Sequence, residues 1–228
     1  MLTFFGDGGA FAFDRGNTNA FFKNGDELLL FDCGSKILFD IISQNLLDGV
    51  KKIQIFITHL HPDHAGGLAA LCDYLFYDNI VNNKNVEYNI YYPNSQNIET
   101  ILKLMLVEIK HTQLKNPESS EYVKGVFNQK HFENAYGYLF EINGKKIYYS
   151  GDTSEINKDS VKLLIDNQID YYYHEASSTK NPWHTYLYEI ADAVPENLRH
   201  KVYIMHINSQ MENEVKKLGF NLCNKIMN

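Results

Sequence analysis

A short stretch in the first third of the chain contains three histidines and one aspartate. This stretch, which we call the histidine turn, runs from Thr58 to His64 and has the sequence THLHPDH. The residues before it, 53–57 (IQIFI), have isoleucine at alternate positions, which is typical of a buried β-strand. Residues 68–76 have the apolar pattern of a helix. The histidine turn is therefore expected at the end of a buried strand, where rigid elements hold side chains within reach of water.

Imidazole and carboxylate groups together are typical ligands of zinc and related first-row metals. His59 and His61 leave the predicted strand end on the same side, while Asp63 and His64 follow the bend at Pro62 and can face a second ion. The chain has nine histidines, and three of them lie in this one turn. We therefore interpret the stretch as a metal-binding turn rather than as a polar turn that is rich in histidine by chance.

Length and charge limit the classes of protein that fit the chain. Its 228 residues suffice for one sizeable core, and its net charge of -7 disfavours a large nucleic acid as partner. Three widely spaced cysteines, Cys33, Cys72 and Cys223, imply no disulfide framework. The N-terminus has neither the basic segment nor the apolar run of a signal peptide, and no apolar stretch reaches membrane-spanning length. We therefore expect a cytoplasmic protein without a membrane partner.

Apolar patterns and turn residues predict the order of the elements. Strands are predicted at 2–5, 18–22, 28–31, 53–57, 88–92, 122–127, 138–142, 145–149, 171–174 and 202–205. Helices are predicted at 37–47, 68–76, 98–109, 160–165, 187–194 and 211–218, with loops at 77–87 and 110–120. Asn143-Gly144 is the strongest hairpin turn in the chain. This order favours two packed sheets with helices outside them in one domain.

Polar residues that follow apolar runs form a second pattern. Asp32, Asp152, Glu175 and His206 each lie at a predicted strand end, and His131 lies in a loop just before another strand. A single residue of this kind is more often a surface or core residue than a ligand. Strand ends that meet at one edge of a sheet are where sites are built, so we expect these residues to converge on the histidine turn.

The joint pattern resembles the metallo-β-lactamase superfamily in order and spacing across nearly the full chain. The resemblance implies an α+β fold, a four-layer αβ/βα sandwich, as a single domain over residues 1–228. It also implies two divalent metal ions at one edge of the sheets, zinc foremost and manganese or iron as alternatives. The implied ligands are His59, His61 and His131 for one ion and Asp63, His64 and His206 for the other, with Asp152 bridging the two. Asp32 is implied not as a ligand but as a residue that holds the histidine turn in place.

Within the superfamily the chain is most similar to the ribonuclease Z branch. Three segments resemble it: residues 4–6 with 15–19, residues 131–138 with Gly-Asp-Thr at 151–153, and His-Glu-Ala-Ser at 174–177 with His184 and Thr185. In that branch the glutamate orients a histidine that protonates the leaving oxygen. The resemblance therefore implies these roles for Glu175 and His184, and it implies that Asp63 both binds metal and accepts the proton of the attacking water.

The chain also departs from ribonuclease Z. The long arm that binds transfer RNA in that branch would lie within 110–130, and this interval is neither glycine-rich nor strongly basic. Lysine and arginine dominate the affinity for nucleic acid, and here 21 of them stand against 28 acidic residues. We therefore predict a small phosphodiester substrate, such as a cyclic or short nucleotide. Trp183, Tyr186 and Phe132 are candidate stacking faces for a base.

These features predict a dinuclear metal-dependent phosphodiesterase in which a hydroxide between the ions attacks phosphorus. Three alternatives stay open. One is a transfer-RNA 3′-processing endonuclease, and another is a hydrolase of a lactam, lactone or thioester. The third, an iron redox protein, is disfavoured because diiron redox relatives have glutamate where this chain has His61. Similarity to the ribonuclease Z branch also favours a homodimer.

Overall fold

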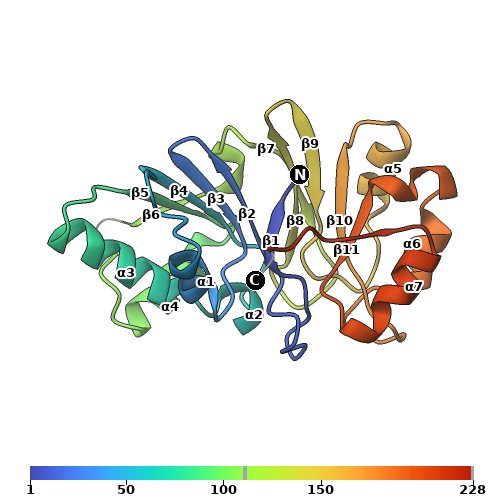
Figure 1. Cartoon of the computed structure of the whole chain (residues 1–228), viewed down its shortest axis with the longest axis horizontal. Helices are drawn as coiled ribbons and strands as arrows, with labels where there is room; N and C mark the ends of the chain where they lie inside the picture. The colour runs from blue at the N-terminus through green and yellow to red at the C-terminus, as the bar shows by residue number, and fades with distance from the viewer. Residues whose placement is uncertain (110–111, 227–228) are drawn as a thin grey trace.

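Two facing β-sheets with helices on their outer sides make up the fold (Figure 1). The computed structural model describes residues 1–109 and 112–226. Each sheet has six strands in this part of the chain, in the orders β1-β2-β3-β4-β5-β6 and β12-β11-β10-β9-β8-β7. The α+β class and the two packed sheets predicted from the sequence are confirmed.

The elements have the following bounds. The first sheet contains β1 (Thr3–Gly6), β2 (Asn19–Asn24), β3 (Glu27–Phe31), β4 (Lys52–Phe56), β5 (Glu87–Tyr91) and β6 (Thr112–Lys115). The second contains β7 (Val123–Asn128), β8 (Tyr136–Ile142), β9 (Lys145–Tyr149), β10 (Tyr171–Glu175), β11 (Val202–Met205) and β12 (Asn221–Leu222). The α-helices are α1 (Ile37–Ser43), α2 (Pro62–Ala65), α3 (Leu68–Val81), α4 (Ser95–Leu104), α5 (Lys158–Ile165), α6 (Leu187–Ala193) and α7 (Glu212–Lys217). Short 3-10 helices lie at η1 (Pro117–Ser119), η2 (Glu196–Lys201) and η3 (Ser209–Met211).

Three buried apolar clusters fill the spaces between the layers. Because successive side chains of a strand point to opposite faces, β4 contributes to two of them. Ile53 and Ile55 pack with residues of α1, α3 and α4, whereas Phe56 packs between the sheets with Phe31 and Phe140. The Phe140 ring lies 4.8 Å from that of Phe31 and 4.9 Å from that of Phe56. A third cluster joins β10 and β11 to α5, α6 and α7, which lie at the right in Figure 1.

The parallel strands of both sheets end at the edge where the predicted site residues lie. In the first sheet β3, β4 and β5 run parallel, and in the second β9, β10 and β11 do. Asp32 follows β3, and the histidine turn follows β4 and leads into α2. In the second sheet, Asp152 follows β9, Glu175 ends β10 and His206 follows β11. The topology therefore brings the polar strand ends to one place.

Some predicted boundaries were wrong. Residues 77–81, predicted as loop, continue α3, because Asn79 closes the helix end by bonding both the backbone N–H and the carbonyl of Val86. The helix predicted at 98–109 ends at Leu104, and Leu106 has a left-handed backbone with φ of 59°. Residues 112–115, also predicted as loop, form the edge strand β6; Lys110 and His111 of that predicted loop lie outside the described residues.

Cys33, Cys72 and Cys223 are buried and unpaired. Among residues 1–109 and 112–226, no helix has both the length and the apolar character needed to cross a bilayer.

Candidate active site

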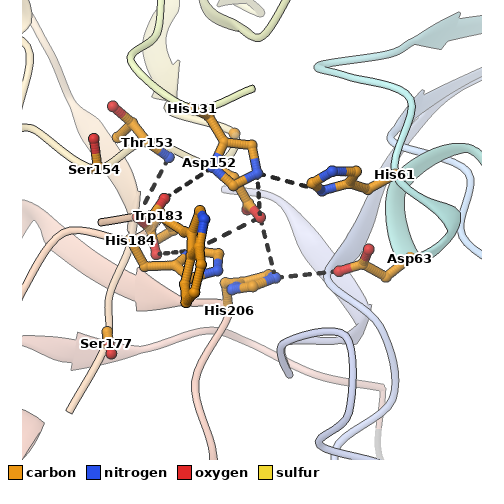
Figure 2. Close-up of polar contacts among 12 residues, drawn as sticks. His61, Asp63, His131, Asp152, Thr153, Ser154, Ser177, Trp183, His184 and His206 are labelled. Atoms are coloured by element: carbon orange, nitrogen blue, oxygen red, sulfur yellow. Dashed lines mark hydrogen bonds and ion pairs between the residues drawn. The ribbon is translucent and has the colours of Figure 1, made fainter. Parts of the chain in front are cut away.

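Histidine and aspartate side chains from both sheets converge on one centre (Figure 2). Among the described residues, three groups of side chains have ligand atoms that all lie within 4.8 Å of one another, and the third of these groups is Glu175, His184 and His206. The first group is His59, His61, His131 and Asp152, and the second is Asp63, His64, Asp152 and His206. The first two groups coincide with the two ligand sets that the superfamily resemblance implies, and Asp152 belongs to both.

The histidine turn reaches the centre through a tight strand-to-helix connection. His61 has an extended backbone at the N-cap of α2, and Pro62 occupies the first turn, where its missing N–H costs nothing. Asp63 and His64 therefore lie in the first turn of the helix, both buried. A Cβ at Gly67 would lie 2.3 Å from the Gly34 carbonyl oxygen, so only glycine allows the end of this connection to pack against the segment after β3.

Asp32 holds the histidine turn in place through contacts with Thr58 and His64. Its fully buried carboxylate accepts hydrogen bonds from the Thr58 backbone N–H at 2.8 Å and from the Thr58 hydroxyl at 3.0 Å. The other oxygen, Oδ2, lies 2.8 Å from His64 Nδ1. Burial raises the pKa of Asp32, and the contacts with His64 and Thr58 oppose that shift. Because Asp32 engages Nδ1 of His64, Nε2 faces Asp63 and Asp152, each at 3.3 Å.

Asp152 lies in the middle of the cluster, as Figure 2 shows. Its carboxylate oxygens lie 3.3 Å from His64 Nε2, 3.4 Å from His206 Nε2 and 3.9 Å from His131 Nε2. Burial opposes ionisation, but His206 and His64 hold the pKa of Asp152 well below its usual range. The preceding Gly151 has φ of 60°, and a Cβ there would lie 2.7 Å from the Thr58 Cβ. Glycine at this turn therefore allows Asp152 to approach the histidine turn.

Backbone groups orient His131 and His206. His131 Nδ1 lies 2.8 Å from the Trp183 carbonyl oxygen, which requires a proton on Nδ1 and leaves the lone pair of Nε2 facing the cluster. The backbone N–H of His206 donates to the Thr18 hydroxyl at 3.1 Å, and its Nε2 lies 3.2 Å from Asp63 Oδ2. His206 has φ of 58°, an uncommon value for histidine that is typical of functional positions.

The chemistry of the cluster fits divalent metal ions. His59 Nε2, His64 Nε2 and Asp152 Oδ1 are buried, and within the described part of the chain none of them makes a hydrogen bond of good geometry, although His64 Nε2 and Asp152 Oδ1 lie 3.3 Å apart. Such unpartnered atoms are rare and costly in protein interiors, unless a ligand satisfies them. Burial also lowers the pKa of His59 well below its usual value, so that its imidazole is neutral and able to bind a metal. Imidazole nitrogens and carboxylate oxygens form the donor set of zinc and neighbouring metals.

Glu175 and His184 form a pair beside the cluster. His184 Nδ1 lies 3.3 Å from Glu175 Oε2, while Oε1 of this fully buried glutamate accepts hydrogen bonds from the backbone N–H groups of Thr185 and Thr153. Burial would lower the pKa of His184, but the contact with Glu175 raises it above its usual value. His184 Nδ1 is also 3.8 Å from Asp152, so the pair adjoins the candidate metal centre.

Two cavities open next to the cluster. The larger, the His184 cavity, measures about 370 Å³ and is lined by residues 9–12, 176–178 and 206–208 with His184 and Met211. The second, the Asp63 cavity, measures about 320 Å³ and is lined by residues 10–13, 16–17, 35–36 and 62–63. Both are in the size range of small-ligand sites.

Several contacts at the site were not assigned from the sequence. The Thr58 hydroxyl lies 3.1 Å from His59 Nδ1, and the Tyr149 hydroxyl lies 3.3 Å from Asp32. The first contact joins sequence neighbours but depends on the conformation of the turn, and the second joins residues that are 117 positions apart, so neither has a sequence pattern that would identify it. Phe11, which lines both cavities, lies in a short glycine- and alanine-rich loop that has no period to interpret.

The three aromatic residues suggested as stacking faces differ in position. The Phe132 ring packs 4.8 Å from His61 and 5.0 Å from His131. Trp183 is half-exposed next to His184, and its carbonyl group contacts His131. The Tyr186 ring instead packs on Tyr188, at 5.2 Å.

Comparisons with known proteins identify relatives of the chain. A family model described as anti-Pycsar protein Apyc1 matches residues 1–223. The chain is 26% identical over 227 residues to the anti-Pycsar protein Apyc1 of Paenibacillus sp. (strain J14), covering 92% of this chain and 90% of that protein. Among solved structures, a diphosphatase of the PhnP family is similar with a TM-score of 0.73 and 21% identity, covering 99% of this chain and 94% of that one. The short form of human tRNase Z has a TM-score of 0.67 and 23% identity, covering 99% and 97%. These similarities confirm the metallo-β-lactamase-like sandwich expected from the sequence.

Proposed function

The chain belongs to the family described as anti-Pycsar protein Apyc1 and is a metal-dependent hydrolase of the metallo-β-lactamase fold, and on this premise we propose that it is a dinuclear phosphodiesterase. The proposed substrate is a small phosphodiester, such as a cyclic or short nucleotide. The observation that supports this best is the pair of ligand groups sharing Asp152, with the Glu175–His184 pair next to them.

We assign the residues as follows. His59, His61 and His131 would hold one divalent ion, Asp63, His64 and His206 the other, and Asp152 both, with zinc as the expected metal. Two such ions, when bound, lower the pKa of water and neutralise charge on a phosphoryl group. Burial opposes ionisation of Asp63, but hydrogen bonds from His206 and His64 lower its pKa. Asp63 therefore stays ionised. We propose that it accepts a hydrogen bond from the attacking water and thereby directs a lone pair of the water oxygen at phosphorus.

His184 is the proposed general acid. Glu175 Oε2 lies 3.3 Å from His184 Nδ1 and raises the pKa of His184 against the effect of burial, which favours the protonated ring that a general acid needs. When the bond between phosphorus and the leaving oxygen breaks, His184 would donate its proton to that oxygen. A sugar alkoxide is a poor leaving group at neutral pH, so this step matters most for a nucleotide substrate.

The size and charge of the molecule support a small substrate. The His184 cavity, at about 370 Å³, suits a ligand of nucleotide size. Two segments with secondary structure are described between α4 and β7. Residues Thr112–Lys115 form strand β6, which pairs with β5, and the 3-10 helix η1 contacts β7. Neither segment offers the transfer-RNA-binding arm of ribonuclease Z, and the net charge of -7 also argues against a long nucleic acid.

The experiment compares leaving groups. Purified protein loaded with zinc or manganese is assayed with bis-p-nitrophenyl phosphate and with a panel of cyclic nucleotides, as wild type, His184→Ala and the control His200→Ala. His200 is an exposed histidine outside the cluster. We expect His184→Ala to lower kcat for cyclic nucleotides about 100-fold or more, and to affect the p-nitrophenyl ester less because p-nitrophenolate leaves without being protonated. Metal content measured by plasma emission spectroscopy should be equal in all three proteins.

The alternatives predict different results. Metal-loaded wild type that cleaves neither class of phosphodiester would refute the proposal. Precursor transfer RNA, lactones and thioesters are then the substrates to assay. A homodimer and a single domain over residues 1–228 remain predictions from the sequence; light scattering of the purified protein tests the first, and limited proteolysis the second.

A further inference from the structure

The loop after β1 exposes two phenylalanine rings to solvent. Phe11 is 85% exposed and Phe13 is 86% exposed. The base of the loop is fixed, because Gly8 pairs with both Asn17 and Ile207 in isolated bridges. Exposed aromatic side chains on an anchored loop next to a site are typical of binding surfaces.

This loop separates the two cavities at the candidate active site. Phe11 lines both the His184 cavity and the Asp63 cavity, whereas Phe13 lines only the Asp63 cavity. Ser178 and Asn208 line the His184 cavity and do not line the Asp63 cavity. Both are exposed, and neither side chain has a hydrogen-bond partner among the described residues. They can therefore bond the polar edge of a ligand.

The position of His184 decides which cavity receives the leaving group. A general acid must lie within hydrogen-bond reach of the oxygen that it protonates. His184 forms part of the wall of the His184 cavity and does not line the Asp63 cavity. If His184 is the acid, as the proposed function has it, the part of the substrate attached to the leaving oxygen lies in the His184 cavity. Small residues there, Gly9, Ala10 and Ala176, leave room for a planar group.

We propose that the His184 cavity binds the heterocyclic base of a nucleotide whose sugar oxygen is the leaving group. Phe11 offers a face on which the base stacks, and Asn208 and Ser178 bond its polar edge. This subsite rests on the proposed phosphodiesterase function and extends it, because it makes the base a determinant of binding. Phe13, although equally exposed, has no part in it.

A pair of substrates and three variants test the subsite. The substrates are a nucleoside 3′,5′-cyclic phosphate and the matching methyl riboside 3′,5′-cyclic phosphate, which lacks the base. The variants are Phe11→Ala, Asn208→Ala and the matched control Phe13→Ala. Because stacking on an aromatic ring contributes substantially to base binding, Phe11→Ala should raise KM for the nucleotide about tenfold while kcat changes less than about twofold. Its KM for the baseless substrate should equal that of wild type.

The other variants complete the pattern. Asn208→Ala should also raise KM for the nucleotide alone, Phe13→Ala should match wild type, and Phe11→Trp should retain a low KM. A nucleotide KM raised by Phe13→Ala but not by Asn208→Ala would overturn the proposal, because the base would then lie in the Asp63 cavity. Equal KM values for the two substrates in wild type would overturn it as well. Wild type that cleaves neither substrate would refute the phosphodiesterase function itself, which is a separate result.

Discussion

His174 is a histidine of the site region that the proposed chemistry does not use. It is fully buried, its Nδ1 donates to the Glu175 carbonyl oxygen at 2.7 Å, and its Nε2 has no partner among the described residues. Burial lowers the pKa of His174 to about 4, because a proton on Nε2 would place an unpaired charge in the interior. His174 is therefore neutral in the folded protein at all but acidic pH.

This shift makes stability depend on pH. In the unfolded chain His174 takes up a proton below about pH 6.5, whereas in the folded protein it does so only close to pH 4. Its contribution to the free energy of unfolding is thus complete above pH 6.5 and falls by about 3 kcal/mol as the pH drops to 4. Urea unfolding of metal-free wild type and His174→Gln at several pH values should give a clearly flatter pH profile for the variant. Parallel profiles for the two proteins would contradict the assignment.

Residue types at predicted strand ends, together with the superfamily resemblance, predicted which side chains gather at the site, because most of them follow a strand whose apolar pattern is local. His59, Asp152 and His206 were found in this way. The backbone geometry that turns them inward was not predicted. Asp32 and His206 have φ of 63° and 58°, values that arise only when neighbouring segments fix the chain after each strand. Phe11 could not be predicted either, because its role depends on which cavities form next to an irregular loop.

At the scale of elements, an ion-pair network around the buried residues Asp7 and Arg15 ties the loop after β1 to the C-terminal region. Both carboxylate oxygens of Asp7 accept hydrogen bonds from Arg15, at 2.6 and 3.0 Å, and both side chains are buried. Arg15 also pairs with Glu212 at the start of α7. The Asp7 carbonyl oxygen accepts the Ile207 N–H at 3.0 Å, directly after His206. This network therefore holds the loop of Phe11 and the His206 segment against each other.

Breaking the Asp7–Arg15 pair should destabilise the fold markedly. Asp7→Asn removes the negative charge that offsets the positive charge of the buried Arg15 guanidinium. We therefore expect the free energy of unfolding to fall by about 3 kcal/mol. Glu99→Gln is the control, because its partner Lys103 is exposed and such pairs contribute at most about 1 kcal/mol. Urea denaturation at neutral pH measures both. Equal unfolding free energies for the two variants would show that the buried Asp7–Arg15 pair contributes no more to stability than an exposed pair does.

The elements that the sequence missed have tertiary causes. β6 (TQLK) has one large apolar residue and lies at the edge of its sheet, so its strand conformation comes from pairing with β5 rather than from a pattern of its own. The end of α3 is rich in polar residues and resembles a loop, but Asp78 is buried there and bonds Asn82. The strand predicted at 53–57 was found within one residue, as β4 (Lys52–Phe56), because burial on both faces of a strand leaves a strong local pattern.

At the scale of the whole molecule, the candidate metal centre joins the two sheets. His59, His61, Asp63 and His64 follow β4 of the first sheet, whereas His131, Asp152 and His206 come from segments of the second sheet. Without ions, this junction contains buried polar atoms that have no hydrogen-bond partner among the residues that the structure describes. Ions bound there would connect segments that are far apart in sequence, so binding should stabilise the packing of one sheet on the other.

Zinc should therefore raise the stability of the entire fold. A ligand that binds only the folded state, at a free concentration of about 1,000 times its Kd, adds about 4 kcal/mol to the free energy of unfolding. The midpoint of urea unfolding should accordingly be much higher with zinc than with a chelator. In His131→Ala, which removes a ligand from the second sheet, the zinc effect should shrink, whereas the exposed control His200→Ala should keep it in full. If zinc leaves the wild-type midpoint unchanged, or stabilises His131→Ala as much as wild type, the ions do not link the sheets through this cluster.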